Sequence, residues 1–590
     1  MIRSLRFAPV IAAAGLAGCI SVPEGVAPMC HSTNDCDRSH GEVCEEGVCW
    51  GDPPPGPYAA VVSAPISRPD LVSRELPQLT IPDYGWMGDL VLEAPVLLSG
   101  KLVAFCPPPL ACDPTPLAGT VTVTRQSQFH GGPGFRAVAN VASGASFAIP
   151  VRRTQPNDDD YTVTILPDAT PQASGPSPAE LVPPRRLHVS VVDNTAAQEI
   201  DLGGADLPQV TGHLLDSAGR GIAGYRVSAL GHWDVSEAPS EVSSIDVTDT
   251  SGAYAITLSD ELVGPVELIA RPVPARPGDP LPVAPTMHVV NVDSAASSVH
   301  DVRAPANLGN PTTVTLQIQG INTGGTTVNV SGAQVEVTGV STTTGSLTSF
   351  TMSDVEVSNT GGQVALHLLD GDGISGSYRM SITPPGGSSY AAMFDQKLTL
   401  GMPPQVRLGA RLQMVGVLVG TDGKPLGNAA VTVRPSLRFL WTLDAAPQAF
   451  VAAIPAATVT TGQDDGSFTL WVDPNITDVY GHYDIVFEPP VDSRGPTFVL
   501  ADYAIEKFGS LKVANVSTVQ VPDPAFVHGR ITGPDGESVE GAELKLYVVQ
   551  TQLTLCSQVQ HAPASCPIPA QLRSRNTSDE DGTVRLVLPR

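Results

Sequence analysis

Short segments in which apolar residues recur at every second position run along most of the chain. Val415, Val417 and Val419 show this spacing, and Val431 and Val433 repeat it after a polar turn. A spacing of two places such side chains on one face of a β-strand. We therefore expect half-buried strands here, with the valines of each strand facing a core.

The pattern of strands and turns recurs about once every hundred residues, which is the length of one small domain. The clearest copies read VTGHLLDSAGRGIAGYRVSAL, VGVLVGTDGKPLGNAAVTV and VHGRITGPDGESVEGAELKLY. Looser copies start near Leu98 and Val314, which predicts five structural units. Each unit carries a glycine in its first strand: Gly100, Gly212, Gly320, Gly416 and Gly529.

Two tight turns separate the strands of a unit. The first reads DGKPLGNA or DSAGRGIAG and the second DDGSF or DTSGAY, where Asp and Gly favour turn conformations. The aromatic residue after the second turn, Phe468 or Tyr254, is predicted to point inward, and Tyr483, Ile485 and Phe487 to share one face of a later strand. Two sheets packed face to face bury both sets of apolar residues. The predicted fold class is therefore all-β, with tandem Ig-like or transthyretin-like β-sandwiches.

The predicted domains follow these repeats and the proline-rich breaks around them. Residues 1–18 form a signal peptide, 19–50 a cysteine-rich module, and 51–97 a Pro-rich linker and lead-in that contains GDPPPGPY. The β-sandwiches are predicted at 98–205, 206–305, 306–408, 409–523 and 524–590. The last of them lacks the Tyr-x-[VI]-x-[IF] strand and its neighbour, which would leave an open sheet edge. We expect either a truncated chain or compensation by Cys556, Cys566 and a neighbouring unit.

The repeat resembles the carboxypeptidase regulatory-like domain. The shared pattern is G-x-[VIL], then D-x-x-G-x-P-[VIL]-x-[GN]-A-x-V, then T-D-x-x-G-x-[FY], and the units at 210, 415 and 527 follow it better than those at 98 and 314. The resemblance implies a transthyretin-like (prealbumin-like) sandwich of seven strands, often found in tandem in secreted bacterial proteins. It implies no protease activity, because these modules accompany carboxypeptidases as structural appendages.

The first nineteen residues have the layout of a secretory signal peptide. Arg3 and Arg6 precede the apolar run FAPVIAAAGLAGC, which is too short to cross a bilayer. The tetrad ending in Cys19, LAGC, resembles the lipobox of bacterial lipoproteins, which implies that Cys19 carries the acyl chains of a lipid anchor. The alternative is an ordinary signal peptide with an incidental cysteine. Ile20, in place of aspartate, favours the outer membrane.

Eight cysteines remain besides Cys19, an even number that suits disulfides in an oxidising compartment. Four lie in CHSTNDCDRSHGEVCEEGVC, which has too few apolar residues for a core. This stretch is similar to EGF-like or Dickkopf-like modules that follow lipoboxes in myxobacterial proteins. Three connectivities are possible; we favour Cys30–Cys44 with Cys36–Cys49, and a zinc site is the alternative. The other candidate disulfide cysteines are Cys106, Cys112, Cys556 and Cys566.

The amino-acid composition agrees with an all-β fold, and the net charge excludes one class of partner. The 590 residues include 56 Gly and 56 Pro but only 5% aromatic residues, as expected of an all-β chain with many turns. Acidic residues outnumber basic ones by 59 to 33, which gives a net charge of −26. A surface of this charge repels the phosphate backbone, so we expect no nucleic-acid partner.

The sequence shows no catalytic motif, and we predict a protein that is not an enzyme and uses no cofactor. Neither G-x-S-x-G nor H-E-x-x-H occurs. Acidic turns at 157–161, 369–373, 463–466 and 578–582 offer carboxylates that would suit calcium, but Asp and Gly are also ordinary turn residues. We predict solvated turns and no metal site. The five tryptophans do not recur at matching repeat positions, which favours packing over a carbohydrate platform.

These patterns predict a non-enzymatic, lipid-anchored protein of the cell envelope. A string of five sandwiches would reach roughly 150–200 Å from the membrane and serve adhesion, scaffolding or ligand presentation. Inserts at 434–458 and 548–572 are the expected recognition loops. The expected partners are the membrane, through the anchor, and a glycan or protein ligand. The alternative is a carbohydrate- or peptide-binding accessory subunit of an exported hydrolase.

Overall fold

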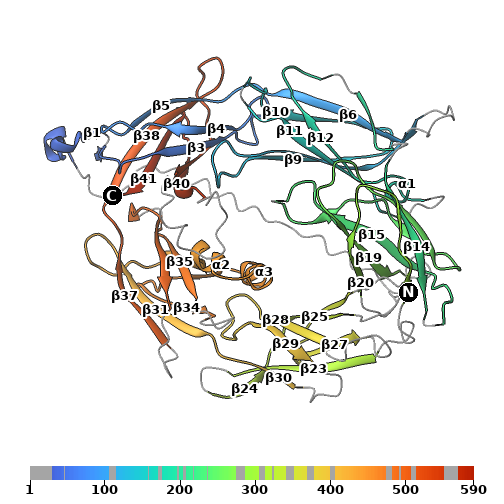
Figure 1. Cartoon of the computed structure of the whole chain (residues 1–590). Helices are drawn as coiled ribbons and strands as arrows, with labels where there is room; N and C mark the ends of the chain where they lie inside the picture. Colours follow the sequence, from blue (N-terminus) through green and yellow to red (C-terminus); the bar gives the residue numbers. More distant parts are fainter. Residues whose placement is uncertain are drawn as a thin grey trace, which may run out of the picture.

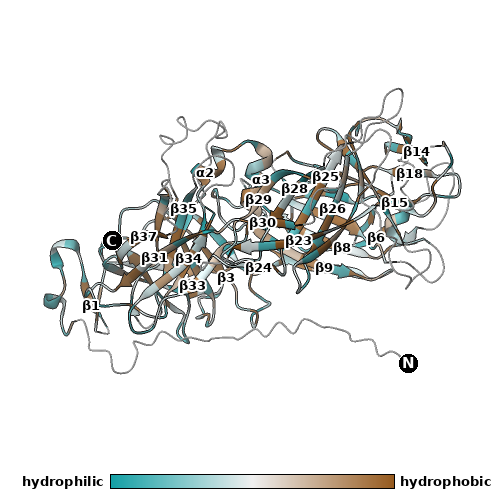
Figure 2. Cartoon of the chain, turned by 90° about the horizontal axis from the view of Figure 1, so that it is seen from below, coloured by the Kyte–Doolittle hydropathy of each residue, from teal (hydrophilic) through white to brown (hydrophobic). Residues whose placement is uncertain are grey.

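The computed structural model describes residues 30–590 except 46, 105–113, 157, 171–175, 196–197, 204–206, 217, 236, 274–285, 304–311, 322–324, 341–350, 369–377, 399–404, 474–480, 491–492, 506–512 and 550–568. The described chain is nearly all β-structure, which confirms the predicted fold class. Its sheets are arranged in pairs around a closed ring (Figure 1). Figure 2 shows the ring edge-on, with hydrophobic residues concentrated along the strands.

Unit 4 shows the plan of one β-sandwich. Its first strand is the centre of a three-stranded sheet and pairs antiparallel with its fourth strand and parallel with its seventh. The other four strands form the second sheet, in the order β33-β32-β35-β36. The strands of unit 4 are β31 (Leu412–Val419), β32 (Ala430–Pro435), β33 (Ala457–Thr460), β34 (Ser467–Val472), β35 (His482–Glu488), β36 (Phe498–Ala504) and β37 (Val513–Gln520).

Units 1 to 3 follow the same plan, with short extra strands. Unit 1 comprises β6 (Val96–Ala104), β7 (Thr115–Pro116), β8 (Gly119–Arg125), β9 (Phe135–Val141), β10 (Ser146–Val151), β11 (Tyr161–Pro167), α1 (Pro178–Leu181), β12 (Arg185–Val189) and β13 (Gln198–Asp201). Unit 2 comprises β14 (Gln209–Leu215), β15 (Tyr225–Gly231), β16 (Ser240–Glu241), β17 (Asp246–Val247), β18 (Ala253–Thr257), β19 (Val266–Pro272), β20 (Thr286–Val292), β21 (Ser298–Val299) and β22 (Val302–Arg303). Unit 3 comprises β23 (Thr312–Ile321), β24 (Thr327–Asn329), β25 (Gln334–Val340), β26 (Thr351–Val357), β27 (Gln363–Leu368), β28 (Tyr378–Thr383), β29 (Met393–Leu398) and β30 (Gln405–Leu408).

The fifth sandwich, here called the closing unit, is built from both ends of the chain. Four strands come from the C-terminal segment: β38 (Pro524–Thr532), β39 (Glu543–Val548), β40 (Gln571–Thr577) and β41 (Thr583–Pro589). Three come from the N-terminal segment: β3 (Tyr58–Ser63), β4 (Arg74–Leu79) and β5 (Trp86–Val91). β3 pairs antiparallel with β39, and β5 pairs parallel with β38, as β35 pairs with β32 and β37 with β31 in unit 4.

This closure corrects two predictions. Residues 51–97 are not a linker, because they contain three paired strands, and the last unit does not lack its later strand pair. Tyr58 of β3 has the same place in its sheet as Tyr483 of β35, so the strand that the last unit apparently lacks lies at the other end of the sequence. A strand so distant in sequence carries no periodic signal that links it to its partner.

The prediction of an extended string of separate sandwiches is also wrong. The two ends of the chain share one sandwich, so the five units curve into a ring (Figure 1). Units 2 and 3 are joined further by β20 and β26, which pair antiparallel and merge one sheet of each unit into a single sheet of nine strands. The buried residues of these two units form a continuous hydrophobic cluster, whereas unit 1, unit 4 and the closing unit each have their own.

One predicted core face is wrong in β31. Of the predicted face, Val415 and Val417 are only partly buried and Val419 is buried, whereas Leu412, Met414 and Leu418 of the other face are all buried. Both faces of this strand are largely apolar in sequence, so spacing alone could not choose between them, and a one-residue shift exchanges the faces. The remaining predicted core positions are correct, because Val431, Val433, Phe468, Tyr254, Tyr483, Ile485 and Phe487 are all buried.

The repeat glycine has a packing role in units 1 and 4. A Cβ atom built on Gly416 would lie 2.5 Å from the ring of Phe468, and one on Gly100 would lie 2.8 Å from the ring of Phe147. The aromatic residue after the second turn therefore lies flat against the first strand, where only glycine leaves room.

Candidate functional site: the disulfide module at the ring closure

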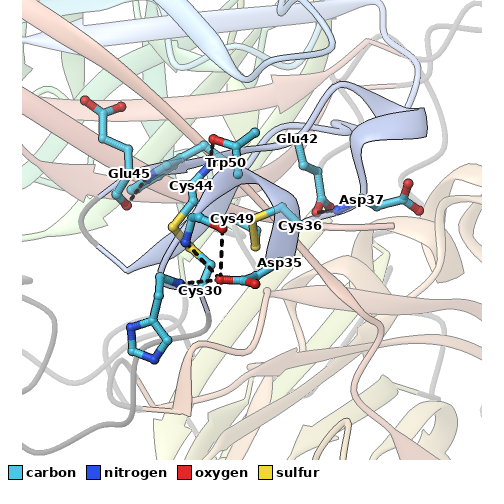
Figure 3. Close-up of a disulfide and its surroundings, with 12 residues drawn as sticks. Cys30, Asp35, Cys36, Asp37, Glu42, Cys44, Glu45, Cys49 and Trp50 are labelled. Atoms are coloured by element: carbon cyan, nitrogen blue, oxygen red, sulfur yellow. Dashed lines mark hydrogen bonds between the residues drawn. A yellow bond between two sulfur atoms is a disulfide. The ribbon is translucent and has the colours of Figure 1, made fainter.

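The cysteine-rich module, residues 30–50, is held by two disulfides and little regular structure. It contains the short 3-10 turns η1 (Thr33–Asp35) and η2 (Arg38–His40) and the strands β1 (Val43–Glu45) and β2 (Val48–Trp50). Cys30 is bonded to Cys44 and Cys36 to Cys49, with Cα–Cα distances of 5.9 and 5.6 Å (Figure 3). This is the connectivity favoured from the sequence. The alternative zinc site is contradicted, because zinc binds cysteine as a thiolate and all four sulfurs are joined in disulfides.

Carboxylates order the loops between the cysteines. Asp35 accepts the backbone N–H groups of His31 and Ser32, both at 2.8 Å, and these bonds lower its pKa. Asp37 accepts the hydroxyl and the backbone N–H of Ser39 and lies 2.8 Å from Nδ1 of His40; the Ser39 hydroxyl, followed by His40, lowers the pKa of Asp37 to about 2. These contacts replace the core that the module lacks.

Aromatic stacking docks the module onto the closing unit. The Trp50 ring stacks on His528 of β38 with ring centroids 4.6 Å apart, and it meets Phe526 edge-on at 6.1 Å. Trp86 of β5 contacts His528 edge-on at 5.0 Å, so the imidazole lies against two indoles. The backbone N–H of Gly51 donates to the Phe526 carbonyl at 2.9 Å. Trp50 retains only 3% of its accessible surface, so the module is packed against the sandwich.

An ion-pair cluster lies in the same contact region between the module, the N-terminal strands and the C-terminal strands, here called the seam. Arg590, after β41, pairs with Glu42 of the module and lies 3.3 Å from the carboxylate of Asp52. Glu42 is buried, at 6% exposure, and also accepts the backbone N–H of Asp37 at 2.9 Å (Figure 3). A buried carboxylate needs such a partner, so Arg590 and Glu42 depend on each other. The module, the N-terminal strands and the C-terminal strands thus form one packed region.

A cavity lies beside this region, between the closing unit and unit 4. Its volume is about 330 Å³, within the range of small-molecule sites. Proline and other apolar side chains form most of its wall, together with two arginines; the lining includes Pro54, Tyr58, Phe498, Pro522, Arg573 and Arg590. Such a wall would favour an apolar group that carries a negative charge.

Some of the remaining predicted site residues lie outside the described part of the chain, and the others have structural contacts. Cys19, Cys106, Cys112, Cys556 and Cys566 lie outside the described residues, as does the acidic turn at 369–373. In the other turns, protein groups bind the carboxylates: the backbone N–H of Ser467 donates to Asp465, Arg152 pairs with Asp158, and Arg585 pairs with Asp579 at 2.5 Å. These contacts give the acidic turns a structural role.

Three of the five tryptophans are too buried to form a binding platform. Trp50, Trp233 and Trp441 are at most 9% exposed. Arg186 covers the Trp233 ring at 4.9 Å from its centroid. A glycan platform needs an accessible aromatic face, so these three rings serve packing.

Two features of the seam escaped the sequence analysis: the stacking of Trp50 on His528 and the pairing of Glu42 with Arg590. The second joins residues 548 positions apart, and no local pattern announces it. Tyr58 gave only a partial signal, because β3 keeps the tyrosine and a following proline but has Ala60 and Val62 where the predicted missing strand has [VI] and [IF].

Within the part of the chain that is described, no helix has the length and apolar character needed to span a membrane.

Comparisons with known proteins add little to this picture. No family model and no curated protein matches the chain. Among solved structures, the chain is similar to the shaft pilin SpaA from Lactobacillus rhamnosus GG, with 14% identity over 36% of this chain and 97% of that one and a TM-score of 0.20. It is also similar to a Streptococcal ancillary pilin, with 12% identity over 52% and 98% of the two chains and a TM-score of 0.17. The Bacillus anthracis TIE protein matches with 9% identity over 72% and 75% and a TM-score of 0.15. TM-scores this low carry no argument, so function must be argued from the chain's own residues.

Proposed function

We propose that this chain is a non-enzymatic, lipid-anchored scaffold of the cell envelope, which holds a ring of five β-sandwiches at the membrane and presents loops to a glycan or protein ligand. The anchor is the acylated Cys19, and the outer membrane is the expected location.

The observation that carries this proposal is the way in which the N-terminal segment is fixed. Cys30 lies in a module that two internal disulfides hold together. The Trp50–His528 stack and the Arg590–Glu42 pair hold this module against the closing unit. Cys19 precedes Cys30 by eleven residues, so an acyl anchor would attach the membrane to one defined place on the ring. Disulfides also agree with an exported protein.

The insert of unit 4 is the best-defined candidate for a presented element. It forms α2 (Leu437–Trp441) and α3 (Ala445–Ala453), which project from the sheets toward the middle of the ring (Figure 1). The two helices have a small core of their own that includes Phe439, Leu443 and Val451. Insertions on a rigid scaffold are where binding surfaces commonly arise.

Metabolic labelling with a palmitate analogue tests the anchor. The wild-type protein should incorporate label and sediment with membranes, whereas Cys19→Ser should be unlabelled and soluble. Ile20→Val is the matched control, because it changes the neighbouring residue and keeps the thiol. An unlabelled, soluble wild-type protein would contradict the proposal.

A further inference from the structure

Unit 3 carries three potential metal ligands at the corner where β26 leads into β27. Asp354 and Glu356 are two residues apart on β26 and therefore share a face, and His367 lies on β27. One ligand atom of each residue lies within 4.8 Å of the others. The two strands belong to different sheets, so the cluster spans both layers of the sandwich.

The contacts of these side chains leave negative charge without a cationic partner from lysine or arginine. Asp354 accepts the backbone N–H of His367 at 2.6 Å, and the same carboxylate oxygen lies 3.5 Å from Nδ1 of that imidazole. Burial raises the pKa of Asp354; burial, followed by the charge of Asp354, raises the pKa of Glu356. Across the described residues, neither carboxylate forms an ion pair with Lys or Arg. A bound cation would neutralise this corner.

Sister units show what the fold itself requires at this corner. A buried Ser or Thr marks the equivalent place: Thr248 in unit 2, Ser358 in unit 3 and Ser578 in the closing unit each accept a backbone N–H from the start of the second main strand. Asp354 lies four residues before Ser358. The residues four positions before Thr248 and Ser578 are Ser244 of unit 2 and Ser574 of the closing unit, so these two serines correspond to Asp354.

Ser244 and Ser574 accept the equivalent of the backbone N–H group that Asp354 accepts in unit 3. The Ser244 hydroxyl accepts the backbone N–H of Thr257 at 2.9 Å, and the Ser574 hydroxyl accepts that of Val587 at 3.2 Å. A neutral hydroxyl therefore satisfies the amide that Asp354 satisfies in unit 3. The equivalents of Glu356 and His367 are Asp246 and Thr257 in unit 2, and Asn576 and Val587 in the closing unit.

Unit 4 shows that the sandwich needs no ionisable group here. Its residues at the three positions are Ala457, Val459 and Trp471. The combination of Asp, Glu and His thus occurs at this corner in unit 3 and not in unit 2, unit 4 or the closing unit.

We propose that Asp354, Glu356 and His367 form a binding site for a divalent transition-metal ion such as zinc. One imidazole nitrogen and two carboxylates make a donor set that suits zinc or manganese better than calcium, which prefers oxygen alone. Ligand atoms around a tetrahedral zinc lie about 3.3 Å apart, as bond lengths near 2 Å require, so modest side-chain rotation closes the site. The Asp354 and His367 side chains are 13% and 18% exposed, which leaves access for the ion and for a water ligand.

The test is calorimetric titration of the purified full-length protein with zinc chloride, compared with the variant D354S/E356N/H367T. The substituted residues all occur at these positions in sister units, and Ser keeps the amide acceptor, so the variant should fold. The wild type should bind one zinc ion more than the variant, and D354S or H367T alone should weaken that binding at least about tenfold. Circular dichroism in the absence of metal checks that the variant keeps its strands.

Two further measurements separate this site from other metal binding. Asp246→Asn changes the equivalent carboxylate in unit 2 and should leave the titration unchanged. Zinc should raise the unfolding temperature of the wild type and not of the triple variant, because binding stabilises only the folded site. Equal zinc uptake with equal affinity in the wild type and the triple variant would overturn the proposal, as would a cobalt spectrum that shows thiolate ligands at the extra site.

Discussion

Unit 4 and the closing unit have the same seven-strand plan, but one is continuous and the other is assembled from the two ends of the chain. Phe487 of β35 follows its paired residue Val431 by 56 positions, whereas Leu544 of β39 follows its paired residue Val62 by 482 positions. Loop-closure entropy grows only with the logarithm of loop length, so this difference costs about 2 kcal/mol. Burial of a single valine or leucine offsets that amount.

A β-sandwich of this kind can thus be assembled from two distant segments of the chain, provided that the pairing of its seven strands is kept. The closing unit keeps the parallel pairing of its first and seventh strands and the tyrosine that opens its fifth strand. Its distinctive part is the seam, where a disulfide module, an aromatic stack and an ion pair are added. The seam is therefore where ring closure can be weakened without damage to the other units.

A buried charge in equivalent strands should have the largest effect and distinguish the two units. Val62 in β3 and Phe487 in β35 occupy matching positions, at 1% and 0% exposure. Val62→Asp and Phe487→Asp should each destabilise their own unit by about 4 kcal/mol or more, since an unpaired carboxylate enters an apolar core. Only Val62→Asp should open the ring.

Small-angle scattering measures the difference. The closed ring should have a radius of gyration on the order of 30 Å, and Val62→Asp should increase it by roughly half as the units separate. Phe487→Asp should leave the closure intact, because the ring then depends on the unchanged closing unit. The same radius of gyration in both variants would show that β3 does not hold the ring together.

Removal of a disulfide should have the next largest effect, confined to the closing unit. The Cys36–Cys49 bond spans 13 positions, and disulfides around loops of this size contribute about 3 kcal/mol. The double variant Cys36→Ser/Cys49→Ser should loosen the module and expose the face of β38 that Trp50 covers.

Hydrogen exchange provides both the readout and its control. The amides of β38 next to Phe526 should lose protection, while those of β32 and β35 in unit 4, which contains no cysteine, should not change. Unchanged protection at β38 would mean that the aromatic stack and Arg590 suffice to hold the module.

The sequence predicted the repeated elements because their signals are local. Asp and Gly turns followed by an inward aromatic ring identify a hairpin without knowledge of its partners, and Phe468 and Tyr254 are buried as expected. The clustering of four cysteines within twenty residues predicted a disulfide module with three possible connectivities, and the favoured one is the one observed.

Long-range features could not be predicted in the same way. The pairing of β3 with β39, the merging of two sheets at β20 and β26, and the contact of Glu42 with Arg590 depend on residues that are neighbours only in space. The face of β31 was assigned wrongly for a different reason: one face carries three valines and the other Leu412, Met414 and Leu418, so both registers bury apolar groups.

The smallest predicted effect concerns pH and the second turn of each unit. In unit 4, the backbone N–H of Ser467, followed by its hydroxyl, lowers the pKa of Asp465. A carboxyl whose pKa is lower in the folded state stabilises that state above its unfolded pKa of about 3.9 and loses this contribution as pH falls. A side-chain amide can fill an acceptor role in such a turn, because in the second turn of unit 3 the Asn359 side-chain oxygen accepts the N–H groups of Gly361 and Gln363 at 2.9 and 3.0 Å.

Asp465→Asn should therefore keep the turn and remove its titration. Between pH 7 and pH 3, the urea midpoint of unit 4 should fall less in the variant than in the wild type, by a small margin, because all other carboxylates are the same in both. The closing unit should show no difference, since its turn relies on Asp579 and Asp581 around the N–H of Thr583. Equal falls for unit 4 in both proteins would mean that Asp465 has the same pKa folded and unfolded, and that the turn depends on its glycine alone.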